Sequence, residues 1–212
     1  MADIKKESLR PAKTPSLDEH NFPDDDFVDK GKLAPVAASV LMKIVYTARC
    51  QRFDLLFPVC VLAREVTRWT RACDKQLHRL VCYVLGTLEW NLEAFIGDPV
   101  QYLSIVLYSD ADFAGDLKDS KSTSGAVVAL VGPNSCVPVS AWCKKQGCVS
   151  HSSTEAEIVS LDASLHQEGL PVLTFWEEMV KLFGPKRTAT AGHTAPIVPF
   201  VVRREITNHL ST

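Results

Sequence analysis

Three apolar runs in series, followed by a capped helix, constrain the fold of this chain most strongly. The runs span residues 102–108, 126–131 and 137–143, they are rich in β-branched residues, and turn-forming residues separate them. Strands in series with no helical pattern between them predict an antiparallel meander. Helical spacing resumes at Ser152-x-x-Glu155, which has the form of a capping box.

The residues before the first run predict helices instead. Between residues 35 and 88, apolar residues recur at intervals of three and four, which predicts three amphipathic helices. Pro35 suits the first turn of the first helix, and Asp74 is a plausible cap for the third. Their expected buried stripes are Val36, Val40, Ile44 and Ala48; Val59, Leu62, Ala63, Val66 and Trp69; and Leu77, Leu80, Val81, Val84, Leu85 and Leu88.

Two more helices and one strand are expected after the third run. The stripe of Ile158, Leu161 and Leu165 predicts that the capped helix packs through these side chains. Gly169-Leu-Pro171 predicts a break, and a second helix should then run to Phe183. Beyond it, residues 197–202 have the composition of one further strand.

Composition and charge exclude several classes of protein. The 212 residues are 46% hydrophobic with a net charge of -2, which suits a globular chain and gives no overall attraction to nucleic acid. Seven cysteines with no close Cys-x-x-Cys pair predict reduced thiols, and no apolar run reaches the roughly 18 residues of a membrane span. Without a signal-peptide pattern, we expect an intracellular protein, cytoplasmic or nuclear, that is not secreted and has no membrane partner.

Two carboxylates are the strongest candidates for chemistry. Asp110 follows the first predicted strand, and Glu157 lies in the first turns of the helix that follows the meander. This arrangement places both at one rim of the sheet, where carboxylate oxygens suit Mg²⁺, or Mn²⁺ in its place, together with substrate phosphate. The alternatives are that Asp110 caps a turn and that Glu157 is a solvated helix carboxylate.

Four sequence blocks carry a resemblance to a known family. They are Tyr108-Ser-Asp-Ala-Asp-Phe-Ala-Gly-Asp116, Ser120-Lys-Ser-Thr-Ser-Gly125, Lys144-Lys-Gln146 and Ser152-Ser-Thr-Glu-Ala-Glu157. In order and spacing they resemble the ribonuclease H domain of copia-type (Ty1/copia) retrotransposon Pol polyproteins. The residues from about 34 to 92 are similar to the end of the reverse transcriptase region, so the resemblance covers roughly residues 33 to 183.

The resemblance implies a fold, a reaction and partners. The fold would be α/β, a ribonuclease H-like core of three antiparallel strands and then helices, preceded by a helical segment. The reaction would be Mg²⁺-dependent hydrolysis of RNA in an RNA/DNA hybrid, with Asp110 and Glu157 as catalytic residues and metal ligands. Partners would be that hybrid and remaining segments of the polyprotein.

The chain also departs from the family pattern. The family has a further strand that ends in a third catalytic aspartate, but residues 186–212 contain no aspartate, and Glu205 is their one acidic residue. No Tyr-x-Asp-Asp polymerase motif occurs either. We therefore expect a truncated or frame-shifted fragment whose ribonuclease activity is weak or absent.

Other residues and functions complete the hypothesis. Lys118, Lys121, Lys144 and Lys145 are candidates for contacts to a nucleic-acid backbone, or else solvated surface. We interpret Asp112, Asp116 and Asp119 as turn residues, although Asp112 could reach a metal through water. The alternatives to an enzyme are a non-catalytic transposon relic with weak nucleic-acid binding, and a helical protein-interaction module formed by residues 35–88.

These observations divide the chain into four parts. Residues 1–32 are expected to form a flexible N-terminal segment, because prolines and the acidic run at 24–26 leave little apolar surface to bury. Residues 33–98 form the helical connection. Residues 99–185 form the incomplete ribonuclease H-like domain, and residues 186–212 form a divergent tail.

Overall fold

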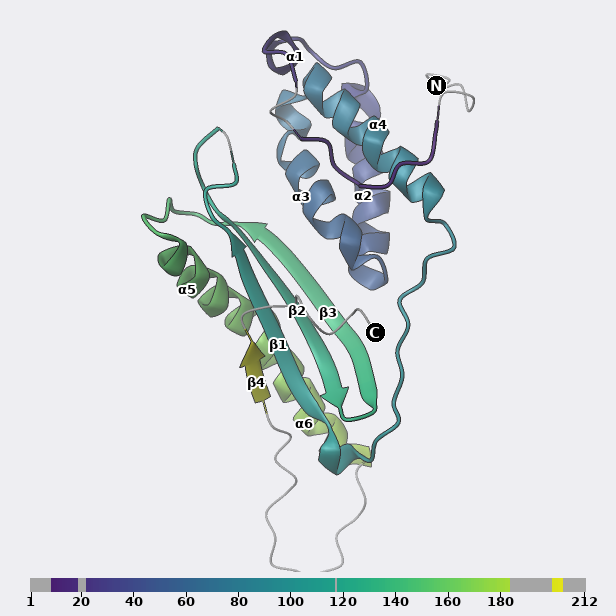
Figure 1. Cartoon of the computed structure of the whole chain (residues 1–212), viewed down its shortest axis with the longest axis vertical. Coiled ribbons are helices and arrows are strands. Elements are labelled where there is room, and N and C mark those ends of the chain that lie inside the picture. The colour runs from purple at the N-terminus through teal and green to yellow at the C-terminus, as the bar shows by residue number, and fades with distance from the viewer. Residues whose placement is uncertain (1–8, 19–21, 117, 184–199, 204–212) are drawn as a thin grey trace, which may run out of the picture. The chain divides into compact units, whose positions relative to one another are not determined.

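The computed structural model describes residues 9–18, 22–116, 118–183 and 200–203. The chain divides into two compact units, residues 1–92 and 93–212. The first unit is helical and the second is a mixed α/β unit (Figure 1). None of the seven cysteines, which all lie within the described ranges, forms a disulfide. No helix in the described ranges is long and apolar enough to cross a membrane.

The first unit contains the predicted helices with altered boundaries and faces. Its helices are α1 (Asp25–Val28), α2 (Ala34–Cys50), α3 (Leu56–Arg64) and α4 (Arg71–Gly86), with short 3-10 turns at Phe53–Leu55 and Val66–Arg68. The predicted face of α2 is confirmed at Ala48, which is buried, but it is wrong at Val36, which is exposed, since Ala37 and Leu41 are the buried residues of the first turns. Small Ala37 allows the neighbouring helix to approach closely, which a count of large apolar residues does not reveal.

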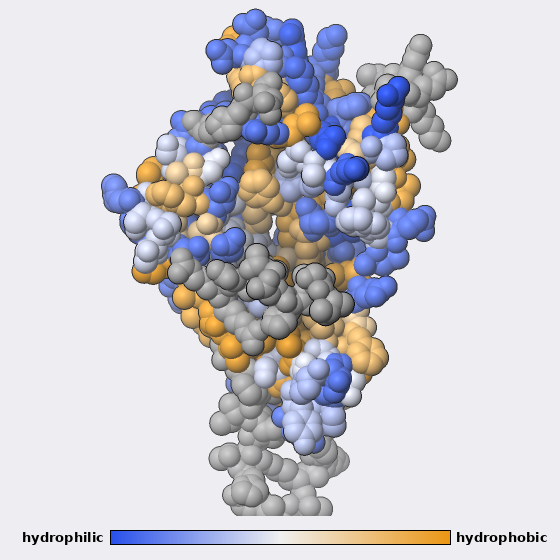
Figure 2. Space-filling view, in the orientation of Figure 1, coloured by the Kyte–Doolittle hydropathy of each residue, from blue (hydrophilic) through white to orange (hydrophobic). Residues whose placement is uncertain are grey.

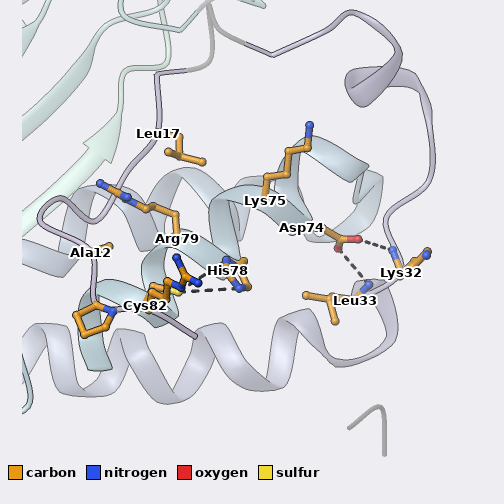
Figure 3. Close-up of a pocket in the computed structure, with 11 residues that line it drawn as sticks. Ala12, Leu17, Lys32, Leu33, Asp74, Lys75, His78, Arg79 and Cys82 are labelled. Carbon is orange, nitrogen blue, oxygen red and sulfur yellow. Dashed lines mark hydrogen bonds between the residues drawn. The ribbon is translucent and has the colours of Figure 1, made fainter. Parts of the chain in front are cut away.

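The cap of α4 also differs from the prediction. Thr70, not Asp74, precedes the helix, and its hydroxyl accepts a hydrogen bond from the backbone N–H of Cys73. Asp74 instead accepts hydrogen bonds from the backbone N–H groups of Lys32 and Leu33 (Figure 3) and from the indole of Trp69. The carboxylate therefore joins α4 to the chain that leads into α2.

Part of the N-terminal segment, which the sequence predicts to be flexible, follows a defined path on α4. The side-chain amide of Gln76 pairs with both backbone groups of Leu17, at 2.9 and 2.8 Å, and Arg79 donates to the backbone oxygen of Thr14 at 2.8 Å. In α1, buried Asp26 pairs with Lys75 and Arg71. Hydrogen bonds and ion pairs from polar side chains of α4 thus hold described parts of this segment in place, although the segment has few apolar side chains to bury.

The second unit is built on a four-stranded sheet. Its strands are β1 (Ser104–Asp112), β2 (Thr123–Gly132), β3 (Ser135–Lys145) and β4 (Phe200–Arg203), after a 3-10 turn at Val100–Tyr102. The order is β3-β2-β1-β4, with β1, β2 and β3 antiparallel and β4 parallel to β1 (Figure 1). The predicted meander is confirmed, and β4 overlaps the strand expected at 197–202; residues 197–199 lie outside the described part.

One long helical segment covers one face of the sheet. It consists of α5 (Ser153–Ser164), a π-helical turn at Leu165–Gly169 and α6 (Leu170–Phe183). The predicted break at Gly169-Leu-Pro171 is wrong, because the wider π turn carries the helix past Pro171, which has no N–H to donate. Beneath it lies a core of Leu103, Ile105, Leu107, Ala126, Val128 and Leu130, with Trp142, Leu165, Val172, Leu173 and Trp176 packed against it.

The predicted apolar stripe of this helix is wrong for Ile158 and Leu161, although its third member, Leu165, packs against the core. Ile158 is 62% exposed and Leu161 is 38% exposed, whereas Ala156, Ser160 and Ser164 are fully buried. These three small residues recur every four positions, so they form one face of the helix and let it lie close to β1 and β2. Large apolar side chains are also exposed elsewhere, and the surface in Figure 2 is a mosaic of hydrophilic and hydrophobic residues.

Candidate active site

Asp110 lies within β1, near the strand's C-terminal end, and its backbone pairs with Gly125 of β2. Ser109, the residue before it, points into the buried interface with α5. Because successive side chains of a strand alternate, Asp110 lies on the opposite face of the sheet, where it is exposed. A Cβ placed on Gly125 would meet no atom within 4 Å, so the space beside Asp110 is open.

Asp112 shares the face of Asp110 and is its nearest acidic neighbour along β1. Burial raises the pKa of the Asp112 carboxyl, and the negative charge of Asp110 raises it further. The Asp112 residue is exposed as a whole, but a Cβ on Gly115 would overlap its carboxylate, so the loop lies close to this group and partly covers it. From the sequence we interpreted Asp112 as a turn residue. In the structure it is the last residue of β1, and it lies close enough to Asp110 for the two carboxylates to repel each other.

Glu157 lies near the start of α5, where the predicted cap at Ser152 is confirmed, although Glu155 bonds the residue before the cap instead of closing the capping box. Ser152 accepts a hydrogen bond from the backbone N–H of Glu155 at 3.1 Å, and Glu155 accepts one from the N–H of His151 at 2.7 Å. Glu157 is partly buried and follows buried Ala156. It does lie at the edge of the buried face, but that face consists of alanine and serine rather than of Ile158 and its neighbours.

Two serines hold α5 against β1 at the candidate site. The hydroxyl of Ser160 donates to the backbone oxygen of Asp110 at 2.6 Å and lies 3.2 Å from the hydroxyl of Ser109. Ser164 lies 3.3 Å from the same Ser109 hydroxyl. Since Glu157 precedes Ser160 by about one helical turn, these bonds join the helix of Glu157 to the strand of Asp110. The side chain of Asp110 lies on the face away from α5, so the bonds do not by themselves bring the two carboxylates together.

Metal binding by these residues stays a prediction. Within the described residues, no three His, Cys, Asp or Glu side chains form a group that could hold a metal ion. The donors that Asp110, Asp112 and Glu157 offer are carboxylate oxygens, which suit a hard divalent cation. A positive ion near Asp110 and Asp112 would also relieve the repulsion that raises the pKa of Asp112.

The third family position has no counterpart in the described part of β4. The last described pair joins Tyr108 to Arg203, two residues before Asp110 on β1. Residues 200–203 contain no acid, and Glu205 lies outside the described residues. The prediction that the tail supplies no matching catalytic acid is therefore not tested at Glu205.

The four lysines predicted to contact nucleic acid differ in their surroundings. Lys144 and Lys145 end β3 rather than lying in a loop, and Lys144 is exposed. Lys145 pairs with Asp116 at 2.6 Å and Asp119 at 2.8 Å. Burial opposes the charge of Lys145, but hydrogen bonds to the two aspartates outweigh it and raise the pKa of its ammonium group. Lys118 and Lys121 belong to the loop that these aspartates anchor.

The helical unit contains a groove that the sequence did not predict. It has a volume of about 680 Å³ and lies between the N-terminal segment and α4 (Figure 3). Its lining is Arg10, Pro11, Ala12, Leu17, Lys32, Leu33, Asp74, Lys75, His78, Arg79 and Cys82. No motif marked it, because its walls come from segments about 60 residues apart in the sequence.

Part of this chain is similar to a protein of Plasmopara viticola described as secreted RxLR effector protein 161. The two are 33% identical over 130 residues, which make up 61% of this chain and 86% of that protein. The chain belongs to the same family as this protein. No protein-family model matches the chain, and no solved structure matches it.

Retrotransposon polyproteins show a partial, distant similarity. The chain is 29% identical over 133 residues to the retrovirus-related Pol polyprotein from transposon TNT 1-94 of Nicotiana tabacum, which covers 62% of the chain. It is 42% identical over 110 residues, or 52% of the chain, to that from transposon RE2 of Arabidopsis thaliana. These matches span 9% and 7% of the polyproteins. The expected relation to copia-type Pol polyproteins is thus confirmed for a small region of them.

Proposed function

We propose that residues 93–203 are a ribonuclease H-like core inherited from a copia-type Pol polyprotein, and that its cleavage of RNA in RNA/DNA hybrids is weak or lost. The preceding helices would then correspond to the end of the reverse transcriptase region. The observation that carries the proposal is the hydrogen bond from Ser160 to the backbone of Asp110, which joins the strand and the helix of the two family acids. The parallel pairing of β4 with β1 also supports it.

Asp110 and Glu157 would be the metal ligands of such a core. Both would hold Mg²⁺ or Mn²⁺, and a bound ion would supply charge neutralisation for attack of water on the phosphodiester. Asp110 faces the open space beside Gly125, which leaves room for a phosphate of the hybrid. Lys144 pairs with Ser124, so it lies on the face of the sheet that α5 covers, opposite to Asp110. Its side chain is exposed at the end of β3 and would contribute an electrostatic contact to a nucleic-acid backbone that reaches this end of the sheet.

The weakness of the proposed reaction follows from the number of carboxylates. A pair of divalent ions needs several oxygen donors to fix both the attacking water and the leaving oxygen. Asp110 and Glu157 supply two family positions, and the sequence after Phe183 contains no aspartate and only Glu205, whose sequence context does not match the family. We therefore propose a site with low metal occupancy rather than a fully active one.

Cleavage of a labelled RNA/DNA hybrid by the purified full chain, with Mg²⁺ or Mn²⁺, tests the proposal. We expect little or no cleavage, and calorimetric Mn²⁺ binding that Asp110→Asn and Glu157→Gln each reduce. Asp162→Asn is the matched control, because Asp162 is an exposed carboxylate on the same helix as Glu157. Metal binding that is unchanged in both site variants would remove the assignment.

Strong cleavage would have a different meaning. If Asp110→Asn abolished it, the site would be complete, and Glu205→Gln would then show whether the tail supplies the missing acid. A folded chain that binds the hybrid but neither cleaves it nor binds Mn²⁺ would favour the non-catalytic alternative. The pattern Arg-x-Leu-Arg in the name of the Plasmopara viticola protein does not occur in this sequence, and we propose no effector role.

A further inference from the structure

Gln146 is the one buried residue of the Lys144-Lys-Gln146 block, and the proposed reaction assigns it no role. It follows the last residue of β3, and only 6% of its surface is exposed. A primary amide carries two donors and an acceptor that lose water on burial, so a buried glutamine has to replace those hydrogen bonds. Its partners therefore show what the side chain holds together.

The Gln146 amide joins three segments of the second unit. Its Nε2 group donates to the backbone oxygen of Ala156 at 2.9 Å and to the hydroxyl of Ser124 at 3.0 Å. Its Oε1 atom accepts a hydrogen bond from the hydroxyl of Ser150 at 3.1 Å. Because the Ala156 oxygen can only accept, nitrogen has to face it, which determines the orientation of the amide.

Both ends of this bridge lie next to a predicted catalytic acid. Ala156 immediately precedes Glu157 on α5. Ser124 pairs with Ala111 of β1, the residue between Asp110 and Asp112. The amide therefore joins the strand position opposite Ala111, between those of the two aspartates, to the helix position beside Glu157.

We propose that Gln146 is a positioning residue that holds the first turn of α5, and with it Glu157, in place against β1 and β2. It acts with Ser160, since Ser160 ties the helix to Asp110 from the next turn. Ala156 and Ser160 are both fully buried, so the two anchors lie on one face of α5. The statement about Glu157 as a metal ligand rests on the proposed function, whereas the fixing of the helix turn does not.

Amide hydrogen exchange of the full chain tests the fixing of the helix. Gln146→Met keeps a similar side-chain volume and removes every hydrogen bond of the amide. We expect the amides of residues 156–158 to exchange about tenfold faster in this variant, the change that loss of about one hydrogen bond would cause. Residues 161–163, one turn further along α5, should stay within about twofold of wild type because Ser160 still anchors them.

Two further variants make this result interpretable. Ser150→Ala removes only the partner of Oε1 and leaves both Nε2 bonds, so residues 156–158 should exchange as in wild type. Ser124→Ala removes one of the two acceptors of Nε2 and is used if Gln146→Met does not fold. We expect residues 156–158 to exchange faster in this variant too, by a smaller factor. Exchange that is unchanged, or faster by the same factor along all of α5, would overturn the proposal.

Mn²⁺ titration of the same variants tests the link to Glu157. We expect the Kd for Mn²⁺ to rise about tenfold or more in Gln146→Met and to stay near wild type in Ser150→Ala, as for residues that orient metal ligands. Wild-type protein that binds no Mn²⁺ would contradict the proposed function, and the exchange result would still decide the role of Gln146. Faster local exchange with an unchanged Kd would refute the link to Glu157.

Discussion

Ser160 donates a 2.6 Å hydrogen bond to the backbone oxygen of Asp110, a residue 50 positions earlier in the chain. The side chain of Asp110 is thus exposed on one face of the sheet while its carbonyl is held from the other. A buried hydroxyl at this point joins β1 to α5 at the position of the predicted metal ligand. Its removal should therefore affect both stability and the site.

We expect Ser160→Ala to lower the free energy of unfolding by about 1–3 kcal/mol, because it leaves the carbonyl of Asp110 without this buried partner. Urea denaturation measures the change. Ser164→Ala is the control, since the hydroxyl of Ser164 lies against the hydroxyl of Ser109, which also has Ser160 as a partner, and its cost should be smaller. An equal or larger loss in the Ser164 variant would contradict the importance of the bond to Asp110.

Gly125→Val should separate stability from binding. A valine here meets open space and suits a strand, so we expect stability to be unchanged or to rise by about 0.5–1 kcal/mol. The new side chain lies directly across from Asp110 and should weaken binding of an RNA/DNA hybrid by roughly tenfold. Gly147→Val, which also enters open space, is the matched control. Equal weakening by both variants would contradict the placement of the hybrid at Asp110.

Asp54 should make the helical unit sensitive to acid. Burial opposes ionisation of its carboxyl, but hydrogen bonds from Arg52 and Tyr83 outweigh burial and lower the pKa of Asp54. A lowered folded-state pKa stabilises the fold above the unfolded-state pKa of about 4, and this contribution is lost as the pH falls through the folded-state pKa. The stability difference between wild type and Asp54→Asn should therefore be fully present at neutral pH and shrink below about pH 4.

Chemical denaturation at a series of pH values measures this difference. Asp162→Asn serves as the control, because its exposed pair with His166 contributes little, and its curve should parallel that of wild type. A difference between wild type and Asp54→Asn that stays constant from neutral to acidic pH would show that the buried Arg52 pair does not depend on the charge of Asp54.

Hybrid binding, where it occurs, should be electrostatic and depend more on Lys144 than on Lys145. Lys144 is exposed, whereas Lys145 is paired with Asp116 and Asp119. We expect affinity to fall steeply with salt, and Lys144→Ala to reduce the slope of log affinity against log salt by about one phosphate contact. Lys145→Ala should change the slope less. An affinity that does not vary with salt would indicate a specific pocket instead.

The sequence alone was sufficient for the order of elements in the second unit. Apolar runs rich in β-branched residues identify β1, β2 and β3, because the preference of the backbone for an extended conformation depends on residues that are close in the sequence. The Ser152 cap was equally local, since the hydroxyl and the N–H that it accepts from are three residues apart. Asp110 and Glu157 could be named as candidates because the sequence blocks around them matched a family pattern.

Only the tertiary structure decided which faces are buried and which distant groups meet. The sequence assigned the contact face of α5 to Ile158 and Leu161, but the helix packs through Ala156, Ser160 and Ser164 because small residues allow close approach and their hydroxyls find partners on β1. The bridge from Gln146 to Ala156 and Ser124 depends on how α5 packs and on strand register. Register and close packing arise from contacts between distant residues, which local sequence patterns do not encode.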